Sequence, residues 1–343
     1  MSEKTEGFDA IADVMKKQYP DQKGLYYGTL LPFRLGGNDP LDGVEIWKSE
    51  KGMPHWHYVT YGFTELYDKE SDDPQVSGYG FELTFRLKRG NEEEPPVWPV
   101  NLLQNLARYV FSSGNVFGSG HHLDCNGPVA LEEDTLLTAL AFRVDPELGE
   151  MDTPNGHMVF LQAAAITRDE LDAMVCWNVD KALKEMEKYI PLCITVLDRP
   201  SLMENPAFYK AWETGVEADG SSTGFLYVEK GEVRLEDGRG TLTLGAICTK
   251  NLPLMLRARI GKGRELFIQS RDAAFSFRPG SQSGIEKDGE LYQFTLTEQA
   301  LSELCALLQP HAGSWQLTSM PLTLRLEPTE ILDSEGKVTE VLY

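Results

Sequence analysis

The sequence has few cysteines for its length, and their spacing excludes two common uses of this residue. Five occur among 343 residues, at Cys125, Cys176, Cys193, Cys248 and Cys305. They are odd in number and no two are spaced as C-x-x-C, whereas a disulfide framework or a zinc ribbon requires paired cysteines. We therefore expect most of these thiols to be buried as small hydrophobic side chains.

The sequence also has far fewer basic than acidic residues. It holds 32 Lys and Arg against 53 Asp and Glu, a formal net charge of −21. Nucleic acid is a poor partner for such a chain, because binding its phosphates requires a basic face. A basic protein partner suits the charge better, since opposite charge speeds encounter. The alternative reading is that the excess of acid only keeps the protein soluble.

Long hydrophobic runs and nucleotide-binding motifs are missing as well. No apolar run approaches the roughly 20 residues of a membrane span, and the start, MSEKTEGFDA, lacks the order of a signal peptide. Neither G-x-G-x-x-G nor G-x-x-x-x-G-K-[ST] occurs. With 41% hydrophobic and 25% charged residues, the chain has the composition of a globular protein. We expect a cytoplasmic protein of about two domains, without a cofactor.

The first part of the chain predicts an α/β domain at residues 1–215. We expect two helices at Phe8–Tyr19 and Val100–Ser112. A third, long helix is expected to begin at the capping box Thr167-Arg-Asp-Glu and to end at Pro191. The expected strands are Trp56–Phe63, Phe81–Leu87, Leu140–Val144 and His157–Ile166. The apolar character of His157–Ile166 predicts a strand in the middle of a sheet. A shorter helix is expected from Pro206 to Thr214.

Residues 216–343 predict a second, β-rich α+β domain. From Gly224 the chain shows short apolar segments separated by turns, with Glu236-Asp-Gly-Arg as a typical hairpin turn. We expect strands to continue at Leu254–Ile260, Glu265–Gln269, Ala274–Arg278 and Trp315–Leu326, with one helix at Thr297–Leu308. Antiparallel sheet should dominate this domain.

Two groups of residues can be read as chemical sites. His55 and His57 point to one face of a strand and could ligate a metal, but no third ligand is evident, so packing and hydrogen bonding are favoured. His121, His122, Asp124 and Cys125 could form a zinc site or a Cys-His nucleophile pair. Consecutive residues rarely converge on one atom, and a loop is the preferred interpretation.

Several longer segments resemble the suppressor of fused family. They are PHWHYVTYGF (Pro54–Phe63), SGYGFELTFRLKR (Ser77–Arg89), WPVNLLQNLARYVF (Trp98–Phe111), TPNGHMVFLQ (Thr153–Gln162), TGVEADGS (Thr214–Ser221) and PLMLRARIGKGR (Pro253–Arg264). The resemblance implies an N-terminal α/β domain and a C-terminal β-rich domain that face each other across a cleft. In animal members, a short peptide of Gli-class transcription factors lies in that cleft as an added strand, which is β-augmentation.

The resemblance also suggests partner-binding residues and where this chain departs from the animal members. The peptide-contacting tyrosine of the family is matched by Tyr109, whereas two acidic ligand contacts are matched by His121 and Val144. Without these carboxylates a ligand histidine would lack its charge partner, so Gli-type peptides are a poor prediction. We expect Tyr109, His121, His122 and Val144 to contact the partner.

The chain is similar to the compact bacterial members of the family, which are associated with polymorphic toxin systems. The resemblance therefore predicts a non-enzymatic immunity protein that binds a cognate toxin, whose domain could be basic. Two alternatives remain open: a regulatory scaffold for an endogenous bacterial protein, and a metal-dependent hydrolase that uses His121, His122 and Asp124.

Overall fold

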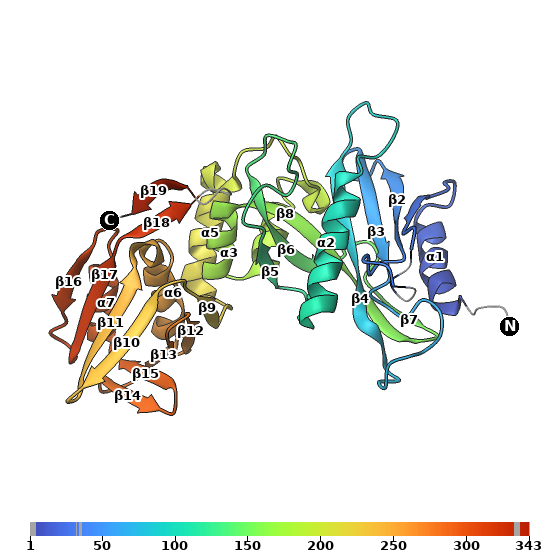
Figure 1. Cartoon of the computed structure of the whole chain (residues 1–343). Coiled ribbons are helices and arrows are strands. Elements are labelled where there is room, and N and C mark those ends of the chain that lie inside the picture. Colours follow the sequence, from blue (N-terminus) through green and yellow to red (C-terminus); the bar gives the residue numbers. More distant parts are fainter. Residues whose placement is uncertain (1–4, 32, 34–35, 333–336, 343) are drawn as a thin grey trace. The chain divides into compact units, whose positions relative to one another are not determined.

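The structure is a computed structural model that describes residues 5–31, 33, 36–332 and 337–342 (Figure 1). The chain separates into two compact units, called unit 1 (residues 1–171 and 179–209) and unit 2 (residues 172–178 and 210–343). The domain limits expected at residues 1–215 and 216–343 stay a prediction. Among the described residues, every helix is too short or too polar to cross a membrane.

Unit 1 is built on one eight-stranded mixed sheet. Its strands are β1 (Leu25–Gly28), β2 (Gly43–Ser49), β3 (His55–Tyr61), β4 (Val76–Lys88), β5 (His122–Asp124), β6 (Leu137–Val144), β7 (Glu150–Thr153) and β8 (Gly156–Thr167). The strand order is β1-β2-β3-β4-β8-β6-β5, and β7 pairs with β8. Only β4 and β8 pair in parallel; the other neighbours are antiparallel. The strand predicted to be central, now β8, lies between β4 and β6 as expected.

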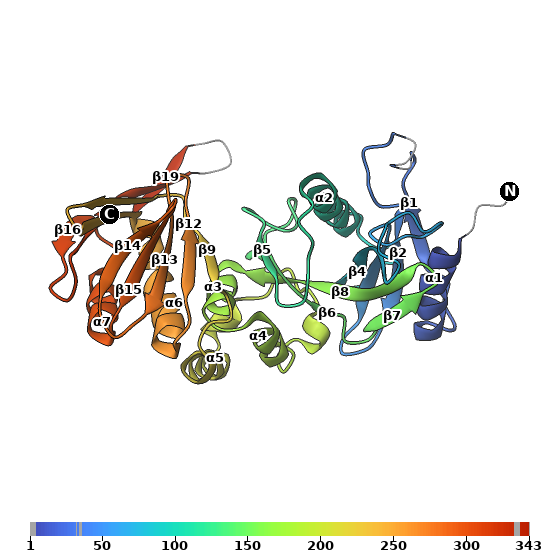
Figure 2. The same cartoon turned by 90° about the horizontal axis from the view of Figure 1, so that it is seen from below.

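Among the described residues, three α-helices belong wholly to unit 1, and two continue into unit 2. The first three are α1 (Glu6–Gln18), α2 (Trp98–Ser113) and α4 (Val179–Met186); the other two are α3 (Arg168–Cys176) and α5 (Pro206–Asp219). In Figure 2, α2 and α4 lie on opposite sides of β6 and β8. The end of α2 is set by Gly114, whose φ of 73° is left-handed and suits glycine.

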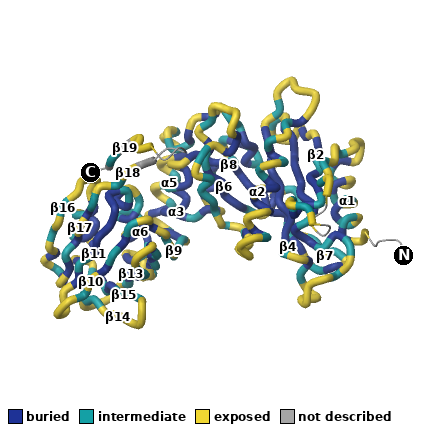
Figure 3. The backbone as a smooth tube through the Cα atoms, in the orientation of Figure 1, coloured by how far each residue is buried: buried dark blue, intermediate teal, exposed yellow. Residues whose placement is uncertain are grey.

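One face of the large sheet is apolar and packs against α2. The predicted alternation in β4 is confirmed, since Phe81, Leu83, Phe85 and Leu87 all belong to this core. The predicted stripe of α2 is confirmed too, because its buried face packs into the same cluster, with Leu103, Leu106 and Val110. The central strands of unit 1 are dark blue in Figure 3, as burial on both faces requires.

The helix predicted from Thr167 to Ile190 is two helices, and this expectation was wrong. The capping box is present: the backbone N–H of Thr167 donates to Glu170 at 2.9 Å. However, α3 ends at Cys176, and the buried Trp177 follows. Its carbonyl accepts the N–H of Ser222 at 2.6 Å and its indole donates to Asp219 at 2.8 Å. Trp177 is thus held by residues outside the helix, and the helix ends here although the apolar periodicity of the sequence continues.

Unit 2 contains three smaller sheets. Its strands are β9 (Phe225–Tyr227), β10 (Gly231–Glu236), β11 (Arg239–Gly245), β12 (Leu266–Gln269), β13 (Ala274–Pro279), β14 (Gly284–Asp288), β15 (Leu291–Leu296), β16 (Gly313–Gln316), β17 (Leu322–Glu327), β18 (Thr329–Leu332) and β19 (Val338–Leu342). The sheet orders are β10-β11-β17-β16, β14-β15-β13-β12-β9 and β18-β19. The predicted hairpin at Glu236-Asp-Gly-Arg is confirmed between β10 and β11.

Two predicted strands of unit 2 were wrong. Leu254–Ile260 lies mostly in a helix, α6 (Leu252–Arg259), which packs against α7 (Glu298–Leu307). A short apolar run does not distinguish strand from buried helix, and Pro253 in the first turn favours the helix. The single strand expected at Trp315–Leu326 is interrupted between β16 and β17, because the carboxylate of Glu303 binds the intervening loop.

The cysteines agree with the sequence expectation. All five are free thiols, and four are buried, at Cys176, Cys193, Cys248 and Cys305. Burial raises the pKa of each of these thiols, to about 11 or 12. They therefore stay protonated at neutral pH and act as small hydrophobic side chains.

Candidate functional site

Strand β5 forms one edge of the large sheet of unit 1. It pairs with β6 on one side, with His122 opposite Ala141 and Asp124 opposite Ala139. On its other side, the described part of the chain supplies no strand. An unpaired edge presents backbone N–H and C=O groups that an extended segment of another chain can bind.

The register shows which backbone groups of β5 face outward. The N–H of Cys125 donates to Thr138 at 3.0 Å, and the carbonyl of His121 accepts the N–H of Phe142 at 2.9 Å. Odd-numbered residues therefore bond to β6, and by the alternation of antiparallel ladders the backbone groups of His122 and Asp124 point away from it. Outside the sheet ladders, neither N–H bonds to another backbone group of the described residues. The edge thus offers two donors and two acceptors.

A stack of aromatic rings connects this edge with α2. Tyr109, on the last turns of α2, stacks on Phe117 with ring centroids 5.8 Å apart. Phe117 stacks in turn on Phe142 of β6, at 4.3 Å and 15°. The Tyr109 ring remains 40% exposed, whereas Phe142 is fully buried. Tyr109 is therefore an exposed ring on a rigid base, a common arrangement at binding surfaces.

The two neighbouring histidines lie in different surroundings. His121 is exposed and precedes β5, whereas His122 is its first residue and is partly buried. Burial, together with the His121 imidazole, lowers the pKa of His122. In the part of the chain that the structure describes, the buried Nδ1 atom of His122 has no hydrogen-bond partner. Because this atom is inaccessible, only the outer part of the His122 ring can meet a partner at the edge.

Val144 lies at the end of β6, two residues beyond Phe142. Side chains two apart in a strand share a face, so Val144 lies on the side of the sheet that carries the aromatic stack. It is 40% exposed. The structure therefore brings Tyr109, His121 and Val144 into one region around Phe142, although they are distant in the sequence.

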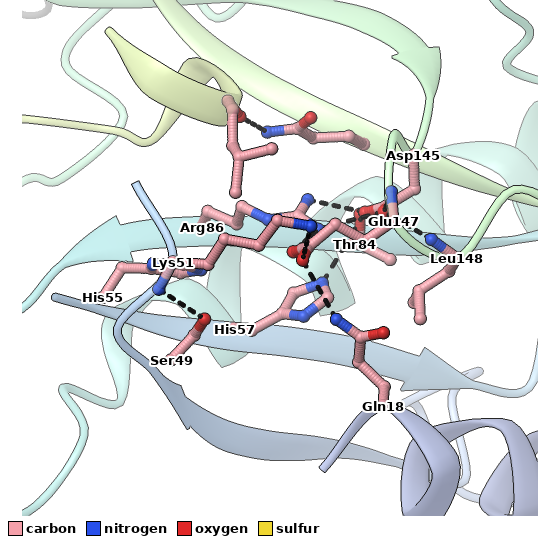
Figure 4. A network of polar contacts seen from close by, with 12 residues as sticks. Gln18, Ser49, Lys51, His55, His57, Thr84, Arg86, Asp145, Glu147 and Leu148 are labelled. Atoms are coloured by element: carbon pink, nitrogen blue, oxygen red, sulfur yellow. Dashed lines mark hydrogen bonds and ion pairs between the residues drawn. The ribbon is translucent and has the colours of Figure 1, made fainter. Parts of the chain in front are cut away.

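The residue after Val144 anchors the end of β6 in a buried polar network (Figure 4). The carboxylate of Asp145 accepts two hydrogen bonds from the Arg86 guanidinium, at 2.6 and 3.0 Å, and one from the Thr84 hydroxyl at 2.6 Å. Arg86 also bonds Glu147 at 2.9 Å. Both Arg86 and Asp145 are inaccessible to solvent. Such bidentate, charge-assisted pairs fix their strands in one position.

The ionised state of this network follows from its pairing. Burial alone would raise the pKa of Asp145, but the adjacent Arg86 guanidinium and the His57 ring hold it well below its usual range. For His57, burial and the charge of Arg86 lower the pKa. Its Nδ1 atom lies 2.8 Å from the Tyr19 hydroxyl, and its Nε2 atom lies 3.6 Å from Asp145. Asp145 is thus a carboxylate paired with Arg86, while His57 is neutral.

The histidine pair in β3 serves packing and hydrogen bonding. The rings of His55 and His57 are 6.4 Å apart, and Nδ1 of His55 lies 2.8 Å from the Met53 carbonyl. Within the described residues, no group of three or more His, Cys, Asp or Glu side chains is placed to hold a metal ion. His121, His122 and Asp124 form no such group either; the Asp124 carboxylate pairs with Arg168.

We expect His55 to make stability depend on pH. Burial lowers the pKa of His55 to about 4, against an ordinary value of about 6.5. The unfolded chain binds the proton more readily, so the free energy of unfolding should fall by roughly 2–3 kcal/mol as the pH drops from about 6.5 to about 4. Urea unfolding at several pH values should show that this pH dependence of the free energy of unfolding is absent in His55→Asn. The control His311→Asn, at an exposed histidine, should keep it. Equal curves for wild type and His55→Asn would contradict the prediction.

Several features of the site were not foreseen from the sequence. The β5 edge, the stacking of Phe117 between Tyr109 and Phe142, and the pairing of Arg86 with Asp145 all depend on contacts between distant segments. The alternation in FELTFRLK places Arg86 on the face opposite the apolar residues, which is typical of exposure to solvent, so the pattern gave no sign that the arginine is buried and paired. The sequence did not indicate which carboxylate that partner was.

Comparison with known proteins agrees with this fold. The family described as "Suppressor of fused protein (SUFU)" matches residues 37–200. The human suppressor of fused homolog is 36% identical over 238 residues, which cover 63% of this chain and 48% of the human protein. A chain in the crystal structure of the Sufu-Fu complex is 31% identical, with a TM-score of 0.57, and the match covers 62% of this chain and 97% of that chain. The chain belongs to the suppressor of fused family.

The family resemblance extends in fold over most of the chain. The crystal structure of Drosophila Suppressor of Fused matches with a TM-score of 0.80 over 95% of this chain and 98% of that chain. At 23% sequence identity this match shows the fold alone. The mouse suppressor of fused homolog matches as the human protein does, at 36% identity and 48% of its length. The chain thus spans about half the length of the curated relatives that it matches.

Proposed function

We propose that this suppressor of fused protein is a non-enzymatic binding module that holds an extended segment of a partner polypeptide along the outer edge of β5. The observation that carries the proposal is the register of β5, which turns the backbone N–H groups of His122 and Asp124 away from β6 on a side where the described chain supplies no strand. An added strand would use these groups whatever its own sequence. Side chains around the edge would then select among partners.

The side chains near the edge support a polypeptide ligand. Tyr109 and Val144 are each 40% exposed and apolar, which suits side chains of an added strand. His121 is exposed and His122 is partly buried, and neither adds negative charge to the edge. We therefore keep Tyr109, His121, His122 and Val144 as the proposed contacts, and we do not expect a ligand that depends on a carboxylate at positions 121 and 144.

Unit 2 offers a second edge of the same kind. Strand β9 ends its five-stranded sheet, and the Phe225 and Tyr227 side chains on it are each 53% exposed. Phe225 stacks on Phe267 at 5.8 Å. A partner segment that pairs with β9 would meet aromatic side chains, as at β5. We propose β9 as a further contact within the same binding function, and we propose 1–215 and 216–343 as the limits of the two domains.

For the partner, we propose a cognate toxin, so that the chain acts as an immunity protein in the cytoplasm. The net charge of −21 supports a basic partner. The second candidate is a regulatory scaffold for an endogenous protein, and the observation that favours it is the relative solved as the Sufu-Fu complex. Co-expression distinguishes the two: an immunity protein restores growth of cells that produce the toxin domain encoded beside its gene, and a scaffold does not.

Photo-crosslinking tests the site. A photoreactive phenylalanine at position 109, 121 or 144 should crosslink to the co-purified partner, whereas the same residue in place of the exposed Glu290 of β-hairpin β14–β15 should not. Tyr109→Ala and His121→Glu should each weaken the complex several-fold. A partner that binds both variants as tightly as the wild type, and that crosslinks only from position 290, would place the interface elsewhere.

A further inference from the structure

Unit 1 contains a pocket away from the β5 edge. Its volume is about 530 Å³, within the range of roughly 300–1,000 Å³ that is typical of ligand sites. It forms where the loop after β3 meets the start of β4 and the last turns of α2. None of the residues proposed to contact the partner at β5 lines it.

The lining of the pocket is largely aromatic and acidic. Phe63, Tyr79 and Phe111 line it, and the Phe111 ring centroid lies 6.1 Å from that of Phe63 and 4.9 Å from that of Tyr79. Phe63 is buried, whereas Tyr79 and Phe111 are partly exposed. The faces of such rings attract cations, most strongly where water is partly excluded.

The charged residues of the lining are all acidic. Asp42, Glu65, Asp68 and Glu70 line the pocket, and its described lining includes no Lys, Arg or His. Glu65 is compensated by Lys69 at 2.6 Å. The Asp42 carboxylate, by contrast, accepts hydrogen bonds from the neutral hydroxyls of Tyr26 and Tyr67. Negative charge therefore remains at Asp42 and at the exposed Asp68 and Glu70.

The walls of the pocket are held in place before any ligand binds. Glu65 accepts the backbone N–H groups of Glu70, Ser71 and Gly78, at 2.5 to 3.1 Å. The buried Glu82 accepts those of Gly62 and Thr64, at 2.9 and 3.0 Å. A loop fixed by two carboxylates loses little further entropy on binding, which favours affinity.

We propose that this pocket binds an arginine side chain carried by a basic partner polypeptide. The guanidinium group is planar, weakly hydrated and always charged, so it can pack against the aromatic side chains of the lining while the carboxylates compensate its charge. Its aliphatic stem would cover the apolar part of the pocket. The acidic balance of the whole chain, −21, favours approach of such a partner. This site is independent of the β5 edge.

A calorimetric titration of the full chain with acetyl-Gly-Arg-Gly-amide tests the proposal. The citrulline analogue has nearly the same shape without charge and should bind at least about fivefold more weakly. Asp68→Asn and Glu70→Gln, at exposed positions, should each weaken arginine binding roughly two- to fivefold. The control Glu290→Gln removes one negative charge from unit 2 and should leave binding unchanged.

Aromatic variants test the part that the rings of the lining play in binding. Tyr79→Leu should weaken binding about three- to tenfold, whereas Tyr79→Phe, which keeps the ring, should bind within twofold of the wild type. Equal affinity for the arginine and citrulline peptides, or unchanged binding in the Asp68→Asn and Glu70→Gln variants, would overturn the proposal even if Tyr79→Leu fails to fold. His122→Pro should leave this titration unchanged, which separates it from the site at β5.

Discussion

Replacing Arg86 by methionine should lower the free energy of unfolding by about 3–5 kcal/mol. The substitution leaves Asp145, which is fully buried, without the guanidinium that donates two hydrogen bonds to it. An unpaired carboxylate in a dry interior is costly, because neither water nor another cation compensates it. The effect should be visible in urea denaturation followed by circular dichroism.

A matched variant separates burial from pairing. Arg108 pairs with Asp39 at the surface, where the two side chains are 46% and 37% exposed. Arg108→Met should therefore cost less than about 1 kcal/mol. Combining Arg86→Met with Asp145→Asn removes the unpaired charge and should recover part of the loss. A cost below 1 kcal/mol for Arg86→Met alone would show that the network does not anchor the end of β6.

Replacing His122 by proline should weaken partner binding at least tenfold. Proline removes the outward-facing N–H of the edge and adds a ring where an added strand would lie. The ladder to β6 should survive, because the bonds to β6 come from odd-numbered residues and proline is tolerated at the first residue of an edge strand. The free energy of unfolding should change little.

His122→Ala is the control for this variant, since it removes the imidazole and keeps the N–H. Binding by His122→Ala should stay within about threefold of the wild type if main-chain pairing contributes most of the affinity. Dissociation constants for both variants can be measured by surface plasmon resonance with the co-purified partner. Equal affinity of the Pro and Ala variants would exclude an added strand at β5.

Local patterns in the sequence predicted many of the elements correctly. The alternation of Phe81, Leu83, Phe85 and Leu87 indicated the face of β4 that packs on α2, and the Thr167–Glu170 capping box indicated the start of α3. The apolar character of β8 indicated its central place in the sheet. These signals depend on neighbouring residues, which share one helix or strand and hence one periodicity.

Other features were decided by contacts between distant segments. The break after α3 depends on Ser222 and Asp219, which bind Trp177, and the choice of helix for α6 depends on its packing with α7. The apolar periodicity of the sequence continued through the break after α3, and it did not distinguish α6 from a strand. In both places tertiary interactions override the local preference.

The sequence by itself determined the class of the protein: its acidic charge, its α/β and β-rich halves, and segments similar to suppressor of fused proteins. Only the tertiary structure decided which strand is an edge, which carboxylate pairs with Arg86, 59 positions away in the sequence, and which carboxylates line the aromatic pocket. The physical reason is that hydrogen bonds, ion pairs and concave surfaces form between groups that are close in space, and closeness in space is set by the packing of whole elements.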